Sequence, residues 1–207
     1  MSSESEIQEL REEIGLLRGE VNRLNAIEAV KRVKYKYWRS FDTADLDGMA
    51  SVLHEDVFLS IEAGIYSMCY EGRDAYVQMV KEGAHADMIS HHNGHHPEID
   101  IVNENEAIGT WYLYDDLWEF RRGMRLFGTA FYRDRYVREN GEWKIRYSQF
   151  HRLYEIMEPL TERPDIRHHY LASHGYKHEG KEDLEPFPKD TGYKHPPGEM
   201  PPFLDTK

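Results

Sequence analysis

The residues best suited to chemistry in this sequence are four histidines within six positions, in the stretch SHHNGHHPEIDI that runs from Ser90 to Ile101. A histidine changes charge near neutral pH and can act as a general base, and its ring nitrogens also bind zinc. A zinc site needs about three side chains that converge on one point, whereas neighbouring residues of a strand point to opposite faces. We therefore expect no metal site. The pattern leaves open whether one histidine is a base poised by a carboxylate or all have structural roles. The four are His91, His92, His95 and His96.

An aspartate interrupts the most apolar strand-like stretch, TWYLYDDLW. With the two-residue period of a strand, Asp115 shares a face with Trp111 and Leu113, so a carboxylate stands on an apolar face. Desolvation disfavours its charge there, and the side chain needs a partner. Tyr37 and Asp42 form a second polar set at the end of a helical stretch, in YWRSFD. The residue types alone leave structural and functional roles open.

Other chemistries have no signature in the sequence. There is no nucleophile elbow of the G-x-S-x-G type, no glycine-rich phosphate loop and no dinucleotide-binding fingerprint. Cys69 is the single cysteine of the chain, which excludes an intramolecular disulfide and a metal site built from several cysteines. The chemistry that these residues favour is acid–base catalysis by histidine, aspartate and tyrosine side chains.

The charge of the chain argues against nucleic acids and anionic membranes as partners. Its 207 residues include 26 lysines and arginines and 38 aspartates and glutamates, for a formal net charge of −12, whereas such partners require clustered basic residues. No apolar run approaches the roughly 20 residues of a membrane helix. The acidic N-terminus lacks the basic-then-apolar order of a signal peptide. We expect a soluble protein of the cytoplasm.

The first 25 residues carry a heptad pattern of apolar side chains. This segment, residues 1–25, is expected to form an amphipathic helix that either lies on its own domain or contacts another subunit. β-branched residues occupy one of the two apolar positions of the heptad and leucines the other, which favours a two-stranded coiled coil. The apolar heptad residues are Ile7, Leu10, Ile14, Leu17, Val21 and Leu24. A second helix is expected over residues 27–45.

From about Ile99 the apolar period changes from the helical one to two. Three stretches rich in aromatic and β-branched residues, 98–120, 125–140 and 142–156, are typical of long strands joined by tight turns. Helices that precede such strands predict an α+β fold, with a curved antiparallel sheet and helices on one side of it. Eight of the nine prolines follow Met157. Residues 158–207 are either a disordered tail or an extended arm wrapped on the domain. We favour the arm, because a disordered tail usually lacks aromatic anchors such as Tyr170, Tyr176, Phe187, Tyr193 and Phe203.

Several motifs, in this order, resemble the SnoaL-like branch of the nuclear transport factor 2-like superfamily, and specifically the bile acid 7-alpha-dehydratase family. The resemblance covers residues 27–158 and is carried by IEAVKRVKYKYWRSFD, SHHNGHHPEIDIVNENEAIGTWYLYDD, GTAFYRDRYVRENGEWKI and RLYE. It implies a cone-shaped, strongly bent antiparallel sheet closed by N-terminal helices. On this basis residues 26–157 are a SnoaL-like catalytic domain.

The resemblance also implies site residues. The family's catalytic tyrosine falls on Tyr37, its aspartates on Asp42 and Asp115, and its histidine on His92 within SHHNGH. Its arginine of the last strand falls on Arg152, which is expected to pair with a substrate group or with an acidic strand residue. Substrate contacts are also expected from Trp111, Phe150 and His96.

What the resemblance implies about activity is a cofactor-independent lyase that removes water from a hydroxylated, hydrophobic ring compound by acid–base elimination. One alternative is a C–C lyase that releases formaldehyde from a lignin-derived diarylpropane. Others are a polyketide cyclase and a non-catalytic ligand- or partner-binding module. The resemblance further implies a homo-oligomer, for which we favour a trimer over a dimer, although the heptad pattern favours a dimer.

Overall fold

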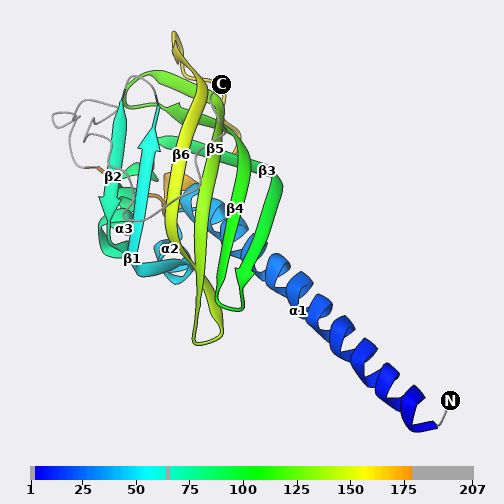
Figure 1. The fold of residues 1–207 in the computed structure, drawn as a ribbon. Coiled ribbons are helices and arrows are strands. Elements are labelled where there is room, and N and C mark those ends of the chain that lie inside the picture. The colour runs from blue at the N-terminus through cyan, green and yellow to red at the C-terminus, as the bar shows by residue number, and fades with distance from the viewer. Residues whose placement is uncertain (1–2, 64–65, 179–207) are drawn as a thin grey trace.

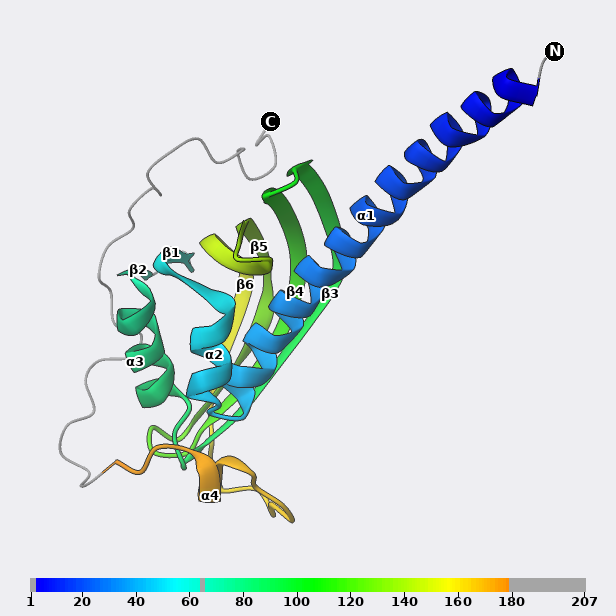
Figure 2. The same cartoon turned by 90° about the horizontal axis from the view of Figure 1, so that it is seen from below.

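The computed structural model describes residues 3–63 and 66–178, and its first element is one long helix, α1 (Ser3–Asp42) (Figure 1). The sequence predicted two helices here, but no proline or glycine separates Leu24 from Ile27, and the helix continues. The N-terminal half projects away from the sheet, whereas the C-terminal half packs inside the sheet's curve (Figure 2). A buried stripe of Val30, Lys34, Tyr37 and Trp38 faces the sheet at helical spacing.

Two further helices follow, of which the first lies beside the packed half of α1 and the second lies on the far side of the first (Figure 2). After α1 ends at Asp42, the side chain of Asp45 caps α2 (Leu46–Val52) by accepting a hydrogen bond of 2.8 Å from the backbone N–H of Gly48. The helix α3 (Arg73–Gly83) follows the second strand. Within the described residues, no helix is both long and apolar enough to cross a membrane.

Six strands form one bent, open sheet in the order β2-β1-β6-β5-β4-β3. The bounds are β1 (Leu53–Glu62), β2 (Ser67–Glu71), β3 (Met88–Asn103), β4 (Glu106–Glu119), β5 (Met124–Glu139) and β6 (Glu142–Pro159). The α+β class with a bent sheet and N-terminal helices is confirmed. The sheet is mixed rather than wholly antiparallel, because β1 pairs in parallel with β6 while the other neighbours are antiparallel.

The histidine-rich stretch lies inside a strand rather than ahead of one. β3 begins at Met88, pairs with β4, and sets His92 opposite Asp115. At Gly94 the strand passes so close to α1 that an added Cβ would stand 1.9 Å from the Trp38 indole. Glycine is therefore required where the helix crosses the strand.

The segment after β6 returns to the domain at the end where α3 stops and β3 begins. The short helix α4 (Leu171–His174) buries Leu171, and Tyr176 forms an isolated bridge with His85. The backbone N–H of Ala86 donates to the Tyr176 carbonyl at 2.7 Å. The predicted arm is thus ordered on the domain as far as residue 178. Its expected anchors Phe187, Tyr193 and Phe203 lie outside the described residues, and the domain boundaries stay predictions.

Candidate active site

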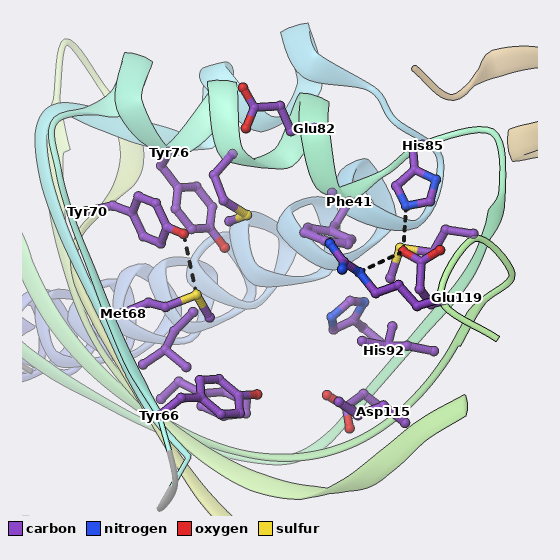
Figure 3. Close-up of a pocket in the computed structure, with 18 of the residues that line it drawn as sticks. Phe41, Tyr66, Met68, Tyr70, Tyr76, Glu82, His85, His92, Asp115 and Glu119 are labelled. Atoms are coloured by element: carbon purple, nitrogen blue, oxygen red, sulfur yellow. Dashed lines mark hydrogen bonds and ion pairs between the residues drawn. The ribbon is translucent and has the colours of Figure 1, made fainter. Parts of the chain in front are cut away.

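A cavity of about 350 Å³ opens between the sheet, α1 and α3 (Figure 3). Its volume lies near the lower end of the range for ligand pockets, roughly 300–1,000 Å³. One wall carries His92 and Asp115, and the wall across the cavity carries Tyr66, Met68 and Tyr70. Of the residues singled out from the sequence, those that line it are Tyr37, His92, Asp115, Phe150 and Arg152.

His92 is held from behind by Asp42, the last residue of α1. The His92 Nδ1 lies 2.7 Å from Asp42 Oδ1, and the His92 backbone N–H donates to Asp42 Oδ2 at 2.9 Å. The Ser90 hydroxyl donates to Asp42 Oδ1 at 2.6 Å, and the Phe41 ring packs edge-on against the imidazole. The carboxylate therefore fixes the ring with Nδ1 toward α1, which leaves Nε2 for the cavity.

The pair shifts both pKa values in the direction that keeps it charged. Burial lowers the pKa of His92, but the charge and hydrogen bond of Asp42 outweigh burial and hold that pKa above its ordinary value of 6.5. Burial likewise raises the pKa of Asp42, and the His92 ring with the Ser90 hydroxyl brings it below its ordinary value. Of the two aspartates, Asp42 is thus the one that orients His92.

Asp115 faces His92 across the β3–β4 ladder and is paired with Arg152. The Arg152 Nη1 donates to Asp115 Oδ1 at 2.6 Å, and both side chains are buried. Burial lowers the pKa of Arg152, but its hydrogen bond to Asp115 reverses that effect and leaves the pKa raised. The guanidinium also lies over the Phe150 ring, 4.8 Å from its centroid. Arg152 therefore fixes the carboxylate of Asp115 at the cavity wall.

Glu155 and Tyr66 extend this network and were not predicted from the sequence. Glu155 Oε2 lies 3.1 Å from Arg152 Nε, and the Tyr66 hydroxyl donates to the same oxygen at 3.1 Å. Burial raises the pKa of Tyr66, so its phenol stays protonated. Two carboxylates around one guanidinium leave this network one formal negative charge in excess. Arg152 consequently has no uncompensated charge to offer an anionic substrate group.

Three tyrosines form the inner end of the cavity. The hydroxyl of Tyr37 is hydrogen-bonded to that of Tyr76, and the ring of Tyr132 meets Tyr37 edge-on. Burial raises the pKa of all three phenols, so they remain protonated near neutral pH. Tyr76 was missed in the sequence, although it stands four residues before Val80 on the buried stripe of α3, where a polar tip is unexpected.

Beneath the tyrosines lies a fully buried ion pair between Lys34 of α1 and Asp134 of β5, with Lys34 Nζ 2.8 Å from Asp134 Oδ2. The Tyr136 and Ser148 hydroxyls each donate to Asp134 at 2.7 Å. The Lys34 ammonium also lies 3.6 Å from the centroid of the Tyr132 ring. This cluster fastens α1 to the sheet, and so it positions Tyr37 and Asp42 on the same helix.

A second histidine–carboxylate pair lies at the mouth and was also missed. His85 Nε2 lies 2.8 Å from Glu119 Oε2, and the Asp87 backbone N–H donates to His85 Nδ1 at 3.2 Å. The ring of His178, from the segment after α4, packs edge-on against His85. Hydrogen bonds from His85 and the Arg121 backbone N–H lower the pKa of Glu119 against the raising effect of burial. The sequence signal was a histidine followed two residues later by an aspartate, just before β3.

Two expected substrate contacts lie away from the cavity. Trp111 is fully buried on the inner face, but it packs against Trp38 and its indole donates to the Tyr136 hydroxyl at 3.0 Å. His96 is exposed, has a positive φ of 50° at an irregularity of β3, and stacks on Tyr112. Neither residue lines the cavity.

In the described part of the chain, no three histidine, cysteine, aspartate or glutamate side chains are grouped to hold a metal ion.

The comparisons with known proteins agree with this geometry at the level of fold and family. The family described as "SnoaL-like domain" matches residues 22–149. This span holds both α1 contributors, Tyr37 and Asp42, and the facing pair His92 and Asp115, and it ends just before Phe150 and Arg152.

Solved structures with the same fold include two whose names refer to elimination reactions. One is a structure from Novosphingobium aromaticivorans that is named for scytalone dehydratase, with 19% identity, a TM-score of 0.60, and coverage of 70% of this chain and 99% of that one. Another is the hexachlorocyclohexane dehydrochlorinase LinA type 3 from Novosphingobium barchaimii, with 20% identity, a TM-score of 0.58, and coverage of 71% and 98%. At these identities the likeness shows the fold.

Proposed function

Because the chain belongs to the SnoaL-like domain family, we propose that its cavity is the active site of a cofactor-independent lyase. The proposed substrate is a hydroxylated, mostly hydrophobic ring compound that loses water. The observation that carries the proposal is the His92–Asp42 pair, 2.7 Å apart, facing the Asp115–Arg152 pair in one cavity. The names of the dehydratase and dehydrochlorinase neighbours support an elimination reaction on this fold.

In this proposal His92 is the base. With Nδ1–H donated to Asp42, the lone pair of Nε2 takes a proton from a substrate carbon, and the electron pair of that C–H bond forms the new C=C bond. The C–O bond breaks and its electrons leave with the hydroxyl group. Asp42 stabilises the imidazolium that forms, as the raised pKa of His92 already indicates.

The other side chains assist the departing hydroxyl group. The protonated phenols of Tyr37 and Tyr76 are hydrogen-bonded to each other, so one O–H of the pair remains to donate to a carbonyl or to the leaving oxygen. Asp115, fixed by Arg152, supports the return of the proton so that the hydroxyl group departs as water. The surrounding wall of Phe41, Leu117 and Phe150 excludes solvent and strengthens these contacts.

The charges of the site also indicate the charge of the substrate. The pairing of Arg152 with two carboxylates disfavours an anionic group next to the reacting atoms. We therefore expect a neutral hydroxylated ring at this end of the cavity. An open cavity lined by acid–base groups supports an enzyme over a binding module, for which a filled cone is expected.

The test is turnover followed by mass spectrometry, with a chelator present, on hydroxy-steroid thioesters, hydroxylated polyketide mimics and diarylpropane diols. The loss of one water that requires His92 supports the proposal. His91→Gln is the matched control for His92→Gln, because His91 is exposed and belongs to the opposite face.

Other products would replace this proposal. Formaldehyde release would identify a C–C lyase in which the base deprotonates a primary hydroxyl group. A ring-closed product of unchanged mass would identify a cyclase. Retention of a compound without turnover would identify a binding module.

A further inference from the structure

The N-terminal half of α1 carries a row of large apolar side chains that remains open to solvent in the described chain. Each of the six is 47–59% exposed, on a helix that projects away from the sheet (Figures 1 and 2). A contiguous apolar row of this kind marks an interaction surface. The row, here called the α1 seam, consists of Ile7, Leu10, Ile14, Leu17, Val21 and Leu24.

The spacing of the α1 seam alternates between three and four residues, which is the a/d pattern of a coiled coil over three heptads. The a positions hold the β-branched Ile7, Ile14 and Val21, and the d positions hold leucine throughout. β-branched residues at a with leucine at d favour two parallel strands over three. Gly15 and Gly19, off the seam, weaken the isolated helix and make it depend on a partner.

The residues that flank the seam have complementary charges and define the orientation of a partner helix. The g positions hold Glu6, Glu13 and Glu20, and the e positions hold Arg11 and Arg18. In a parallel pair, each g residue faces the e residue of the next heptad on the partner. Glu6 then meets Arg11 and Glu13 meets Arg18, whereas Glu20 meets the uncharged Asn25. An antiparallel pair would bring glutamates together and arginines together. The partner that fits is therefore an identical helix in parallel.

We propose that residues 6–25 of α1 bind the same residues of a second copy as a parallel, in-register, two-stranded coiled coil. The protein is then a homodimer, in place of the trimer that we favoured from the family resemblance. The coiled coil is about 30 Å long at 1.5 Å per residue. Because the helices run in parallel, the two domains that follow α1 lie at the same end of the coiled coil. The cavity and the outer face of the sheet take no part in this contact, so the proposal is independent of the proposed function.

The test compares Leu17→Glu with the matched control Leu16→Glu in the full chain. Leu17 is on the seam, whereas Leu16 is 77% exposed at a c position on the outside of the coiled coil. By sedimentation equilibrium, the natural chain and Leu16→Glu are expected at twice the chain mass and Leu17→Glu at the chain mass. Near-ultraviolet circular dichroism confirms that the domain stays folded. A natural chain of one or three copies, or a dimeric Leu17→Glu, would overturn the proposal.

The orientation is tested separately by a cysteine at the end of the seam. Leu24→Cys is made in a Cys69→Ser background, so that the new thiol is the single one in the chain. In the parallel register the two thiols meet and mild oxidation links the chains covalently. An antiparallel pair would place Leu24 opposite Ile7 and the two thiols roughly 25 Å apart. A dimer that does not cross-link at this position would contradict the parallel arrangement.

Discussion

His92 and His85 both line one cavity (Figure 3). Each lies against a carboxylate, at almost equal distances of 2.7 Å to Asp42 and 2.8 Å to Glu119. They differ in the ring nitrogen that the carboxylate takes. His85 accepts the Asp87 backbone N–H at Nδ1 and offers Nε2 to Glu119, so both of its nitrogens are used. His92 offers Nδ1 to Asp42, and its Nε2 has no protein partner among the described residues.

The local chain explains the difference. At His54, as at His85, a backbone N–H two residues later donates to Nδ1 and a glutamate takes Nε2. Such a histidine ties a turn to a neighbouring strand. His92 lies within β3, where its own N–H donates to Asp42 and the carboxylate bridges backbone and ring. A histidine–carboxylate distance by itself therefore does not identify a catalytic base, because a base also needs a ring nitrogen that is free to take a proton.

The largest expected effect is a difference in kcat between variants of the two histidines. His92→Gln keeps a polar side chain of similar size but removes the base, and we expect kcat to fall about 10²–10⁴-fold. His85→Gln should lower kcat less than about tenfold, because neither nitrogen of His85 takes part in proton transfer. Initial rates at saturating substrate measure both variants. Equal losses would remove the distinction between the two pairs.

A smaller effect is expected from the carboxylates. Asp42→Asn removes the charge that holds the pKa of His92 above 6.5, while burial still lowers it. The rise of kcat/KM with pH, which needs neutral His92, should therefore move to lower pH, and kcat at the plateau should fall about 10²-fold. Glu119→Gln should leave the midpoint of the profile where it is. A profile that shifts with Glu119 instead would assign the base to His85.

The same pair makes stability depend on pH. Because the pKa of His92 is raised in the folded state, its contribution to the free energy of unfolding is complete below about pH 6.5 and is lost as the pH rises through the folded value. Asp42, whose pKa is lowered, contributes above its ordinary value of 3.8 and loses that contribution as the pH falls. Urea unfolding of the natural chain and Asp42→Asn across this range measures both slopes. In the variant the slope from Asp42 should disappear, and the loss of stability with rising pH should disappear or reverse, because burial then lowers the pKa of His92.

The smallest effect is structural and falls on the pair at the mouth. His85→Ala removes two hydrogen bonds and leaves the partly buried Glu119 carboxylate with fewer donors. We expect the free energy of unfolding to fall by about 1–3 kcal/mol. Chemical denaturation provides the value, with exposed His91→Ala as control. A change within error would mean that His85 contributes no structural role at the mouth.

Much of the site was predictable because motif order and strand period identify which side chains face inward. Of the five residues that the resemblance named, Tyr37, His92, Asp115 and Arg152 line one cavity, and Asp42 lies directly behind His92. Their roles stay predictions. The inner face was also correct for Trp111, which is fully buried. Period two defines a face but not the depth along the strand, and Trp111 lies where α1 covers the sheet.

Other features depend on tertiary pairing that one sequence does not display. Asp42 and His92 are fifty residues apart, and only the crossing of α1 over β3 makes Asp42, rather than Asp115, the partner of His92. Tyr66 and Glu155 come together through the parallel β1–β6 pairing, which a prediction of antiparallel strands could not include. His96 was misplaced because an irregularity of β3 turns its backbone to a positive φ.

Nitrogen-15 NMR of the two imidazole rings shows which ring nitrogen of His92 and of His85 is free to act as a base. We expect neutral His92 to carry its proton on Nδ1 and to titrate above pH 6.5, with Asp42→Asn lowering that pKa. We expect neutral His85 to carry its proton on Nε2. A neutral His92 ring protonated on Nε2, or a His92 that titrates below pH 6.5, would exclude His92 as the base oriented by Asp42.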